Sequence, residues 1–465
     1  MSRRTIPIQP EPLDSPVYAR SVKGWFNSWR WVMVWFTQLL FYGLPWITWE
    51  GRQAILFDLG TRRFHFFAVT FTPHDLIYLA LLLVISALSL FLFTAVAGRL
   101  WCGYTCPQTV YTKIFSWVEL RIEGDRSARL RRDRGPRNFD WWRHKLAKHA
   151  VWLALGLWTG FTFVGYFTPI RELGHAVVSA SLGPWELFWV LFYGLCTYGN
   201  AGWLRENVCI YMCPYARFQG VMFDRDTVTI TYDANRGEPR GSRSRQADPA
   251  ALGLGDCIDC TLCVQVCPTG IDIRDGLQYE CIGCAACIDA CNDVMDRMEY
   301  PRGLIRYGTE SGLSPRHTGK QLLRRVFRPR VLVYTAILWV LIAVFVAGLW
   351  SHVPVRLEAV RDRTVLMRNT DEGGVENLYQ LHLLNTANQP LTLELSVSGL
   401  PGLELPDDER RVVIDAQGNS ALVVHARLPA EHTVKPGTHP IVFEATSTAD
   451  PSLRVRAESS FILRR

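Results

Sequence analysis

Eight cysteines in the middle of the chain have the spacing of an iron–sulfur ligand set. The pattern Cys-x-x-Cys-x-x-Cys-x-x-x-Cys occurs twice, with 13 residues between the copies. A cubane of four irons has one open corner per iron, and a tight loop of three cysteines reaches three corners while the fourth thiolate comes from the other copy. The spacing therefore predicts two [4Fe–4S] clusters with crossed ligands. The first set is Cys257, Cys260, Cys263 and Cys291, and the second is Cys281, Cys284, Cys287 and Cys267.

Two other interpretations of these eight cysteines are weaker. Disulfides need an oxidising compartment, and zinc sites do not require a doubled pattern of this kind. The residues between the two copies, 271–273 and 277–279 joined across Asp275 and Gly276, suit a short β-hairpin beneath the clusters.

Four further cysteines form two Cys-x-x-x-Cys-Pro motifs at a constant offset of 107 residues. The segments 101–107 and 208–214 match at both cysteines, the tyrosine and the proline, and each follows an apolar stretch. The repeat predicts two parallel helical hairpins, related by an axis along the membrane normal, that bring the four sulfurs together at the cytoplasmic membrane surface. These cysteines are Cys102, Cys106, Cys209 and Cys213.

The chemistry of this second sulfur set supports a metal or redox site. Within a helix, positions i and i+4 place both sulfurs on one face, and a proline after the second cysteine suits the first turn of a following helix. Four thiolates can hold copper as Cu(I), or a further iron–sulfur cluster. The alternative is two ordinary cysteine pairs without a metal. The remaining cysteine, Cys196, is expected to be a packed core thiol.

The composition indicates a multi-pass membrane protein. Of the 465 residues, 49% are hydrophobic and only 20% are charged. The first 30 residues are polar and basic and do not resemble a signal peptide. Five segments are near the length that a bilayer requires. They span approximately residues 31–49, 75–98, 149–167, 184–203 and 331–350.

The distribution of basic residues predicts the orientation. Segment 101–148 holds eleven Lys and Arg, against three in 50–74 and one in 169–183. The positive-inside rule then places the N-terminus, the 101–148 loop and residues 204–330, which include the ferredoxin domain, in the cytoplasm, and five spans leave the C-terminal domain outside. A reducing cytoplasm again favours metal ligands over disulfides.

After the fifth span, short alternating runs separated by turn residues predict an immunoglobulin-like β-sandwich. The fold class is therefore membrane α, ferredoxin-like α+β and all-β. The predicted order is a cytoplasmic tail (1–30), a four-helix membrane domain (31–223), a cytoplasmic connector with a short strand at 227–232 (224–256), a two-cluster ferredoxin domain (257–300), a basic linker (301–330), a fifth transmembrane helix (331–350) and the periplasmic sandwich (351–465).

The combined motifs resemble a known family over nearly the whole chain. Segments 101–107, 209–214, 236–241 and 303–307, together with the ferredoxin cysteines, are similar to CcoG, FixG or RdxA, the cytochrome c oxidase accessory protein of the inner membrane. The resemblance implies a cupric reductase that converts Cu(II) to Cu(I) during assembly of a cbb-type oxidase. The implied partners are membrane lipid, oxidase-assembly and copper-handling proteins, and an electron donor that the sequence does not name.

Two other functions remain open at this point. One is electron transfer linked to quinol, and the other is a non-catalytic scaffold for oxidase assembly. No Gly-rich nucleotide loop occurs, and the basic runs flank membrane spans, which argues against nucleic-acid binding. The sequence leaves open whether the chain forms a homo-oligomer.

Overall fold

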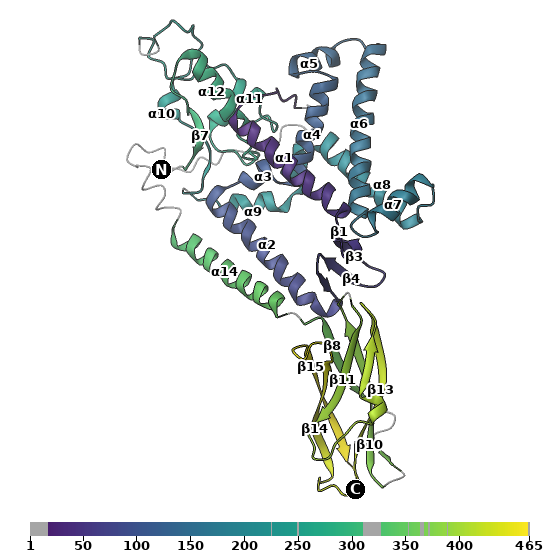
Figure 1. The fold of residues 1–465 in the computed structure, drawn as a ribbon. Helices are drawn as coiled ribbons and strands as arrows, with labels where there is room; N and C mark the ends of the chain where they lie inside the picture. Colours follow the sequence, from purple (N-terminus) through teal and green to yellow (C-terminus); the bar gives the residue numbers. More distant parts are fainter. Residues whose placement is uncertain are drawn as a thin grey trace. The chain divides into compact units, whose positions relative to one another are not determined.

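The computed structural model divides into two compact units, which are considered separately (Figure 1). The first comprises residues 1–68 and 75–342, and the second comprises residues 69–74 and 343–465. The described residues are 17–224, 226–248, 251–309, 327–351, 353–362, 367–370, 373–387 and 389–463.

Helices occupy all five predicted membrane spans, although their boundaries differ. They are α1 (Trp25–Gly43), α2 (Leu76–Ala97), α6 (Phe139–Val164), α8 (Pro184–Tyr198) and α14 (Pro329–Trp350). Among the described residues, α2 and α14 are long and apolar enough to cross a membrane. Helix α6 begins well before the predicted span because Asn138 caps it by accepting a hydrogen bond from Trp141 N. Crossing of the membrane by any of the five helices stays a prediction.

Shorter elements connect these helices within the first unit. Strand β1 (Thr48–Trp49) pairs with β2 (Arg52–Gln53), and β3 (Ile55–Asp58) pairs with β4 (Arg63–Phe66). The short helices are α3 (Leu100–Tyr104), α4 (Pro107–Ile122), α5 (Arg126–Arg134), α7 (Ile170–Val178), the π-helical segments η3 (Gly199–Leu204) and η4 (Val208–Met212), and α9 (Pro214–Met222). Pro107 and Pro214 each begin a helix directly after a cysteine, as predicted.

The ferredoxin region forms around a two-stranded sheet that begins outside the predicted 257–300 range. Strand β6 (Thr229–Tyr232) falls on the predicted strand and pairs antiparallel with β7 (Ile305–Gly308). Between them lie α10 (Ala234–Gly237), α11 (Leu262–Gln265), the 3-10 helix η5 (Ile273–Asp275) and α12 (Ala286–Met298). The predicted hairpin at 271–279 is wrong, because the Asp272 carboxylate caps η5 by accepting from Arg274 N at 3.0 Å.

The second unit contains two four-stranded antiparallel sheets packed face to face (Figure 1). One sheet has the order β13–β10–β8 with β9 also paired to β10, and the other has the order β12–β11–β14–β15. Tyr379, Phe443 and Phe461 are fully buried between them, as the alternating pattern predicts. The strands are β8 (Val355–Arg361), β9 (Arg368–Asn369), β10 (Val375–Asn385), β11 (Leu391–Ser398), β12 (Arg411–Ile414), β13 (Asn419–Leu428), β14 (Gly437–Ser447) and β15 (Arg454–Leu463).

Candidate iron–sulfur and thiolate sites

The first predicted ligand set lines a single cavity, which we call the first cluster cavity. Its cysteines come from the loop before α11, from α11 itself and from α12, and apolar side chains complete its wall. Burial and repulsion from the other three thiols raise the pKa of Cys291 to about 12. The cysteines of this cavity are Cys257, Cys260, Cys263 and Cys291.

The second set lines another cavity, the second cluster cavity, as the crossed pattern predicts. Cys267 from the first motif joins the three early cysteines of the second motif, and Cys263 borders this cavity as well. Burial, followed by repulsion from Cys284 and Cys267, raises the pKa of Cys281 to about 12. The four predicted ligands here are Cys267, Cys281, Cys284 and Cys287.

These two donor sets fit clusters better than single ions. Across the described residues, no group of three or more His, Cys, Asp or Glu side chains is close enough to hold one metal ion. Ligands of a cubane lie on four separate irons, so their sulfurs stand farther apart than ligands of one ion. The loops accommodate this spacing with left-handed backbone at Asp259, Thr261 and Ala285.

The four remaining predicted site cysteines are neighbours that interact electrostatically, although, like the two ferredoxin sets, they are not close enough in the described structure to hold one metal ion. Cys102 lies in α3 and Cys209 in η4, while Cys106 and Cys213 are the N-cap residues of α4 and α9. Burial, and then repulsion from Cys106 and Cys102, raises the pKa of Cys209 to about 12. The Cys102–Cys106 segment is not one continuous helix, because α3 ends at Tyr104 and Cys106 is the non-helical N-cap of α4.

Gln219 is a neighbour of this thiolate set that the sequence did not reveal. Its side chain is fully buried, and its Nε2 donates a hydrogen bond to Cys102 Sγ at 3.3 Å. A donor to sulfur favours the thiolate, although burial still raises the pKa of Cys102 to about 11. By contrast, Cys196 is exposed on α8, so its expected packing in a core is wrong.

Two glycines bring the thiolate set against the second cluster loop. A Cβ on Gly103 would lie 2.7 Å from Gly283 O and 3.0 Å from Cys284 Cα, so α3 and the second cluster loop touch through their backbones. Gly283 has a φ of +70°, which disfavours any side chain there. Tyr307 fixes the same loop by donating from its hydroxyl to Gly283 O at 2.8 Å.

Arg99 joins the same loops from the other side. Its guanidinium donates to Cys281 O at 3.1 Å, to Ala216 O at 2.9 Å and to Tyr279 O. Arg99 therefore connects α9 to the second cluster loop. It precedes Cys102 by three residues in the sequence. Neither this contact nor the Gly103–Gly283 contact had a signal in the sequence, because each depends on how separate loops dock.

Comparison with protein families agrees with this geometry. A family described as a 4Fe-4S dicluster domain matches residues 204–310, and one described as a 4Fe-4S binding domain matches residues 79–125. A third, described as the Ig-like fold at the C-terminus of FixG, matches residues 345–464. These matches confirm the predicted 4Fe–4S and immunoglobulin-like domains.

Three relatives are similar over most of their length. The nitrogen fixation protein FixG of Rhizobium meliloti is 37% identical, covering 89% of this chain and 86% of the relative. Protein RdxB of Cereibacter sphaeroides is 39% identical, covering 94% of this chain and 90% of the relative. Protein RdxA of the same organism is 39% identical, covering 92% of both chains.

Proposed function

Because the chain belongs to the FixG/RdxA family of iron–sulfur electron-transfer proteins, we propose that it reduces Cu(II) to Cu(I) for the assembly of a cbb-type cytochrome c oxidase. The step adds one electron to each Cu(II) ion and needs no proton. A bound [4Fe–4S] cluster supplies single electrons, and soft thiolates retain the Cu(I) product.

The Gly103–Gly283 contact carries this proposal. It holds the loop of Cys102 and Cys106 directly against the loop of Cys281 and Cys284. A group bound by the four-cysteine set would therefore be adjacent to the second cluster, with only the touching backbones between them. Gln219 orients the Cys102 sulfur within that set.

A second candidate occupant of the four-cysteine set is a further [4Fe–4S] cluster. It is favoured by the 4Fe-4S family match over residues 79–125, because the only cysteines in that range are Cys102 and Cys106. Iron analysis separates the two occupants. More than about eight irons per chain, with the excess lost on changing Cys102 or Cys209, would assign the set to iron.

The decisive experiment is anaerobic Cu(II) reduction by full-length protein whose clusters have been reduced chemically, with Cu(I) followed by a chelating dye. Changing Cys102 together with Cys209 to alanine should abolish turnover and leave the spectrum of the two clusters intact. Because residues acting as a unit are non-additive, the quadruple variant should be no worse than this double variant. Wild-type rates in the quadruple variant would refute the copper proposal.

The alternatives predict different outcomes in the same preparation. A quinol-linked electron-transfer protein would oxidise quinol and leave Cu(II) untouched. A scaffold would support oxidase assembly after loss of all four cysteines.

The proposed setting is the bacterial inner membrane, with the ferredoxin domain in the cytoplasm and the immunoglobulin-like domain in the periplasm. Two helices, α2 and α14, have the length and composition that this setting requires. Proposed partners are lipid, copper-handling and oxidase-assembly proteins, and an electron donor. A reporter fused after residue 360 should be active only in a periplasmic format, and cytoplasmic activity would contradict this topology.

A further inference from the structure

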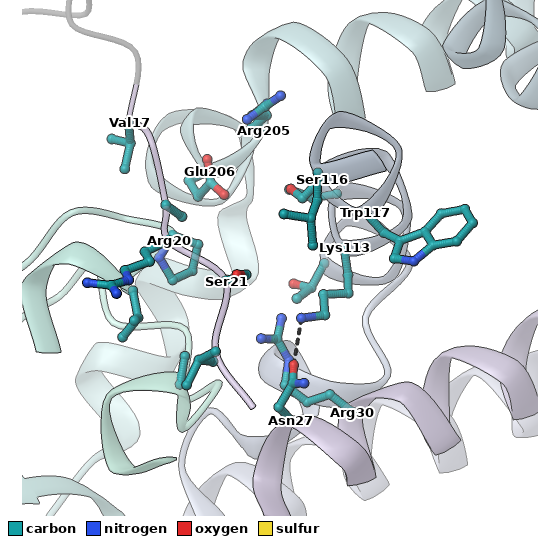
Figure 2. Close-up of a pocket in the computed structure, with 18 of the residues that line it drawn as sticks. Val17, Arg20, Ser21, Asn27, Arg30, Lys113, Ser116, Trp117, Arg205 and Glu206 are labelled. Carbon is teal, nitrogen blue, oxygen red and sulfur yellow. Dashed lines mark hydrogen bonds between the residues drawn. The ribbon is translucent and has the colours of Figure 1, made fainter. Parts of the chain in front are cut away.

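A cavity of about 300 Å³ lies beside the electron-transfer residues (Figure 2). It is bounded by the segment before α1, by α1 and α4, and by the second cluster loop. Ile282 and Ala286 line both this cavity and the second cluster cavity, and Cys209 also lines it. The cavity therefore shares wall residues with both sulfur sites.

The charges that line this cavity are unbalanced. Two carboxylates, Asp125 and Glu206, face six cationic side chains. Burial raises the pKa of Glu206 to about 7, so this carboxyl is only partly ionised at neutral pH. The cations are Arg20, Lys23, Arg30, Lys113, Arg129 and Arg205.

The positive charge of four of the six cations is stabilised either by a carboxylate or by water. Arg129 and Arg205 both bind the Glu119 carboxylate, at 2.7 Å and 2.5 Å. Arg20 and Lys23 are exposed to solvent on the segment that precedes α1. Water stabilises exposed charges, so these four do not require a ligand.

Arg30 and Lys113 differ from the other four cations because neither forms an ion pair in the described structure. Arg30 is only 7% exposed, and its one protein hydrogen bond in the described structure runs from Nε to Gly103 O at 3.2 Å. Lys113 donates to Asn27 Oδ1 at 2.7 Å and lies over the Trp31 ring, which orients its ammonium group without neutralising it. In the part of the chain that the structure describes, neither side chain has a carboxylate within ion-pair distance, although Asp289 interacts with Lys113 and Glu206 with Arg30 at longer range.

Hydrogen-bond donors from α1 and α4 converge at the end of the cavity where Arg30 and Lys113 lie. Figure 2 shows the Arg30 guanidinium next to the hydrogen-bonded Lys113 and Asn27 side chains, with Ser116 on the same wall as Lys113. Burial, followed by repulsion from Arg30, lowers the pKa of Lys113 to about 7, so without a ligand this amine, like Glu206, is only partly ionised at neutral pH. A bound anion would remove that repulsion, and an Arg fork combined with a Lys suits the oxygens of a phosphate group.

We propose that this cavity is a binding site for an oxyanion of the phosphate class, held by Arg30 and Lys113. The group can come from the headgroup of an anionic lipid or from a soluble phosphate. A lipid is sterically compatible, because the cavity-lining Trp117 and Leu120 are exposed apolar side chains of α4. The same positive charge disfavours Cu(II), so we place the anion at Arg30 and Lys113 and not at Cys209, which lines this cavity but belongs to the proposed copper site.

The test is isothermal titration calorimetry on full-length protein with its clusters, in a nonionic detergent. The probes are inorganic phosphate, dioctanoyl phosphatidylglycerol and, as a phosphate-free control, dioctanoylglycerol. Wild-type protein should bind a phosphate-bearing probe saturably, and Lys113→Met should weaken that binding at least tenfold. Lys113→Arg should retain it, and Arg121→Met is the matched control, because Arg121 is an exposed cation of α4 that does not line the cavity.

A further variant tests the cavity without changing any charge. Ser116→Trp should abolish binding by filling the space, while the cluster absorption reports that the protein has folded. Binding of phosphatidylglycerol alone assigns the site to lipid, whereas binding of inorganic phosphate assigns it to a soluble anion. The proposal is overturned if neither phosphate-bearing probe binds, if Lys113→Met binds like wild type, or if dioctanoylglycerol binds equally well. None of these readouts depends on copper reduction.

Discussion

Arg274, which lines the first cluster cavity, binds the carboxylates of Asp259 at 2.5 Å and Asp272 at 2.6 Å. Arg99, which precedes α3 and contacts the second cluster loop, binds backbone carbonyls. In the described residues Arg99 has no carboxylate partner. Positive charge beside a cluster stabilises its more negative, reduced form, so we expect the second cluster to have the higher reduction potential. Two clusters held by the same cysteine pattern can therefore differ in reduction potential because their neighbouring charges differ.

Exposure differs in the same direction. Cys260 of the first set is the one solvent-exposed ligand of the eight, although Cys257 and Cys263 of that set are buried. Cys284 of the second set is buried as well, and its loop is covered by Gly103. The first cluster is therefore the accessible one for an electron donor, and the second is the one adjacent to the four-cysteine set. Both differences favour electron flow from the first cluster to the second.

The largest expected effect tests whether the two sets are crossed. Cys267→Ala should remove the second cluster, because its other three ligands lie in the second motif, and iron should fall from about eight to about four per chain. Cys291→Ala should remove the first cluster instead. EPR of each reduced variant should show the complementary remaining signal. Loss of the first cluster from Cys267→Ala would mean that each motif binds its own cluster.

The next effect concerns the contact between the loops. Gly103→Leu should force the Cys102 loop away from Gly283 and slow Cu(I) formation at least tenfold, with cluster iron retained. Gly43→Ala is the matched control, because a Cβ at Gly43 would meet nothing within 4 Å. Stopped-flow measurement with prereduced protein checks both variants, and an unchanged rate in Gly103→Leu would show that the contact is not on the electron path.

A smaller effect tests the difference in charge. Arg99→Met should lower the second cluster potential by roughly 40 mV, which corresponds to about 1 kcal/mol for a one-electron couple. The first cluster should not respond. Arg274→Met is the reciprocal variant and should lower only the first potential. Redox titration monitored by EPR separates the two signals, and equal shifts of both clusters in Arg99→Met would contradict the proposed difference.

The sequence predicted what is encoded in local spacing. Cysteine spacing indicated which residues share a cavity, and Pro107 and Pro214 indicated where two helices begin. Contacts between distant segments carried no such signal, so Gln219, Arg99 and the Gly103–Gly283 contact were found only in the structure.

The errors have the same origin. The pattern around Asp275 and Gly276 resembled a hairpin, but Asp272 caps a 3-10 helix there. The strand predicted at 227–232 is present as β6, and its partner β7, for which the sequence made no prediction, lies far along the chain. Apolar character alone placed Cys196 in a core, although it is exposed on α8. Local propensity was overridden by side-chain capping in the first case and by the arrangement of helices in the last.

The smallest effect concerns α12, the helix that supplies Cys287 to the second set and Cys291 to the first. Between these cysteines, Asp289 reaches the N-terminus of α1 and accepts hydrogen bonds from Phe26 N at 3.2 Å and Asn27 N at 2.7 Å. Asp289 thus acts as an N-cap supplied by another helix, and removal of an N-cap costs about 1 kcal/mol. Asp289→Ala should therefore lower the thermal midpoint by about 2–4 °C. Asp289→Asn keeps one acceptor oxygen and should therefore lower the thermal midpoint less than Asp289→Ala does. Because α12 serves both clusters, EPR should show both signals broadened together in Asp289→Ala, whereas a change confined to the second cluster would mean that the cap positions only the Cys287 end of the helix.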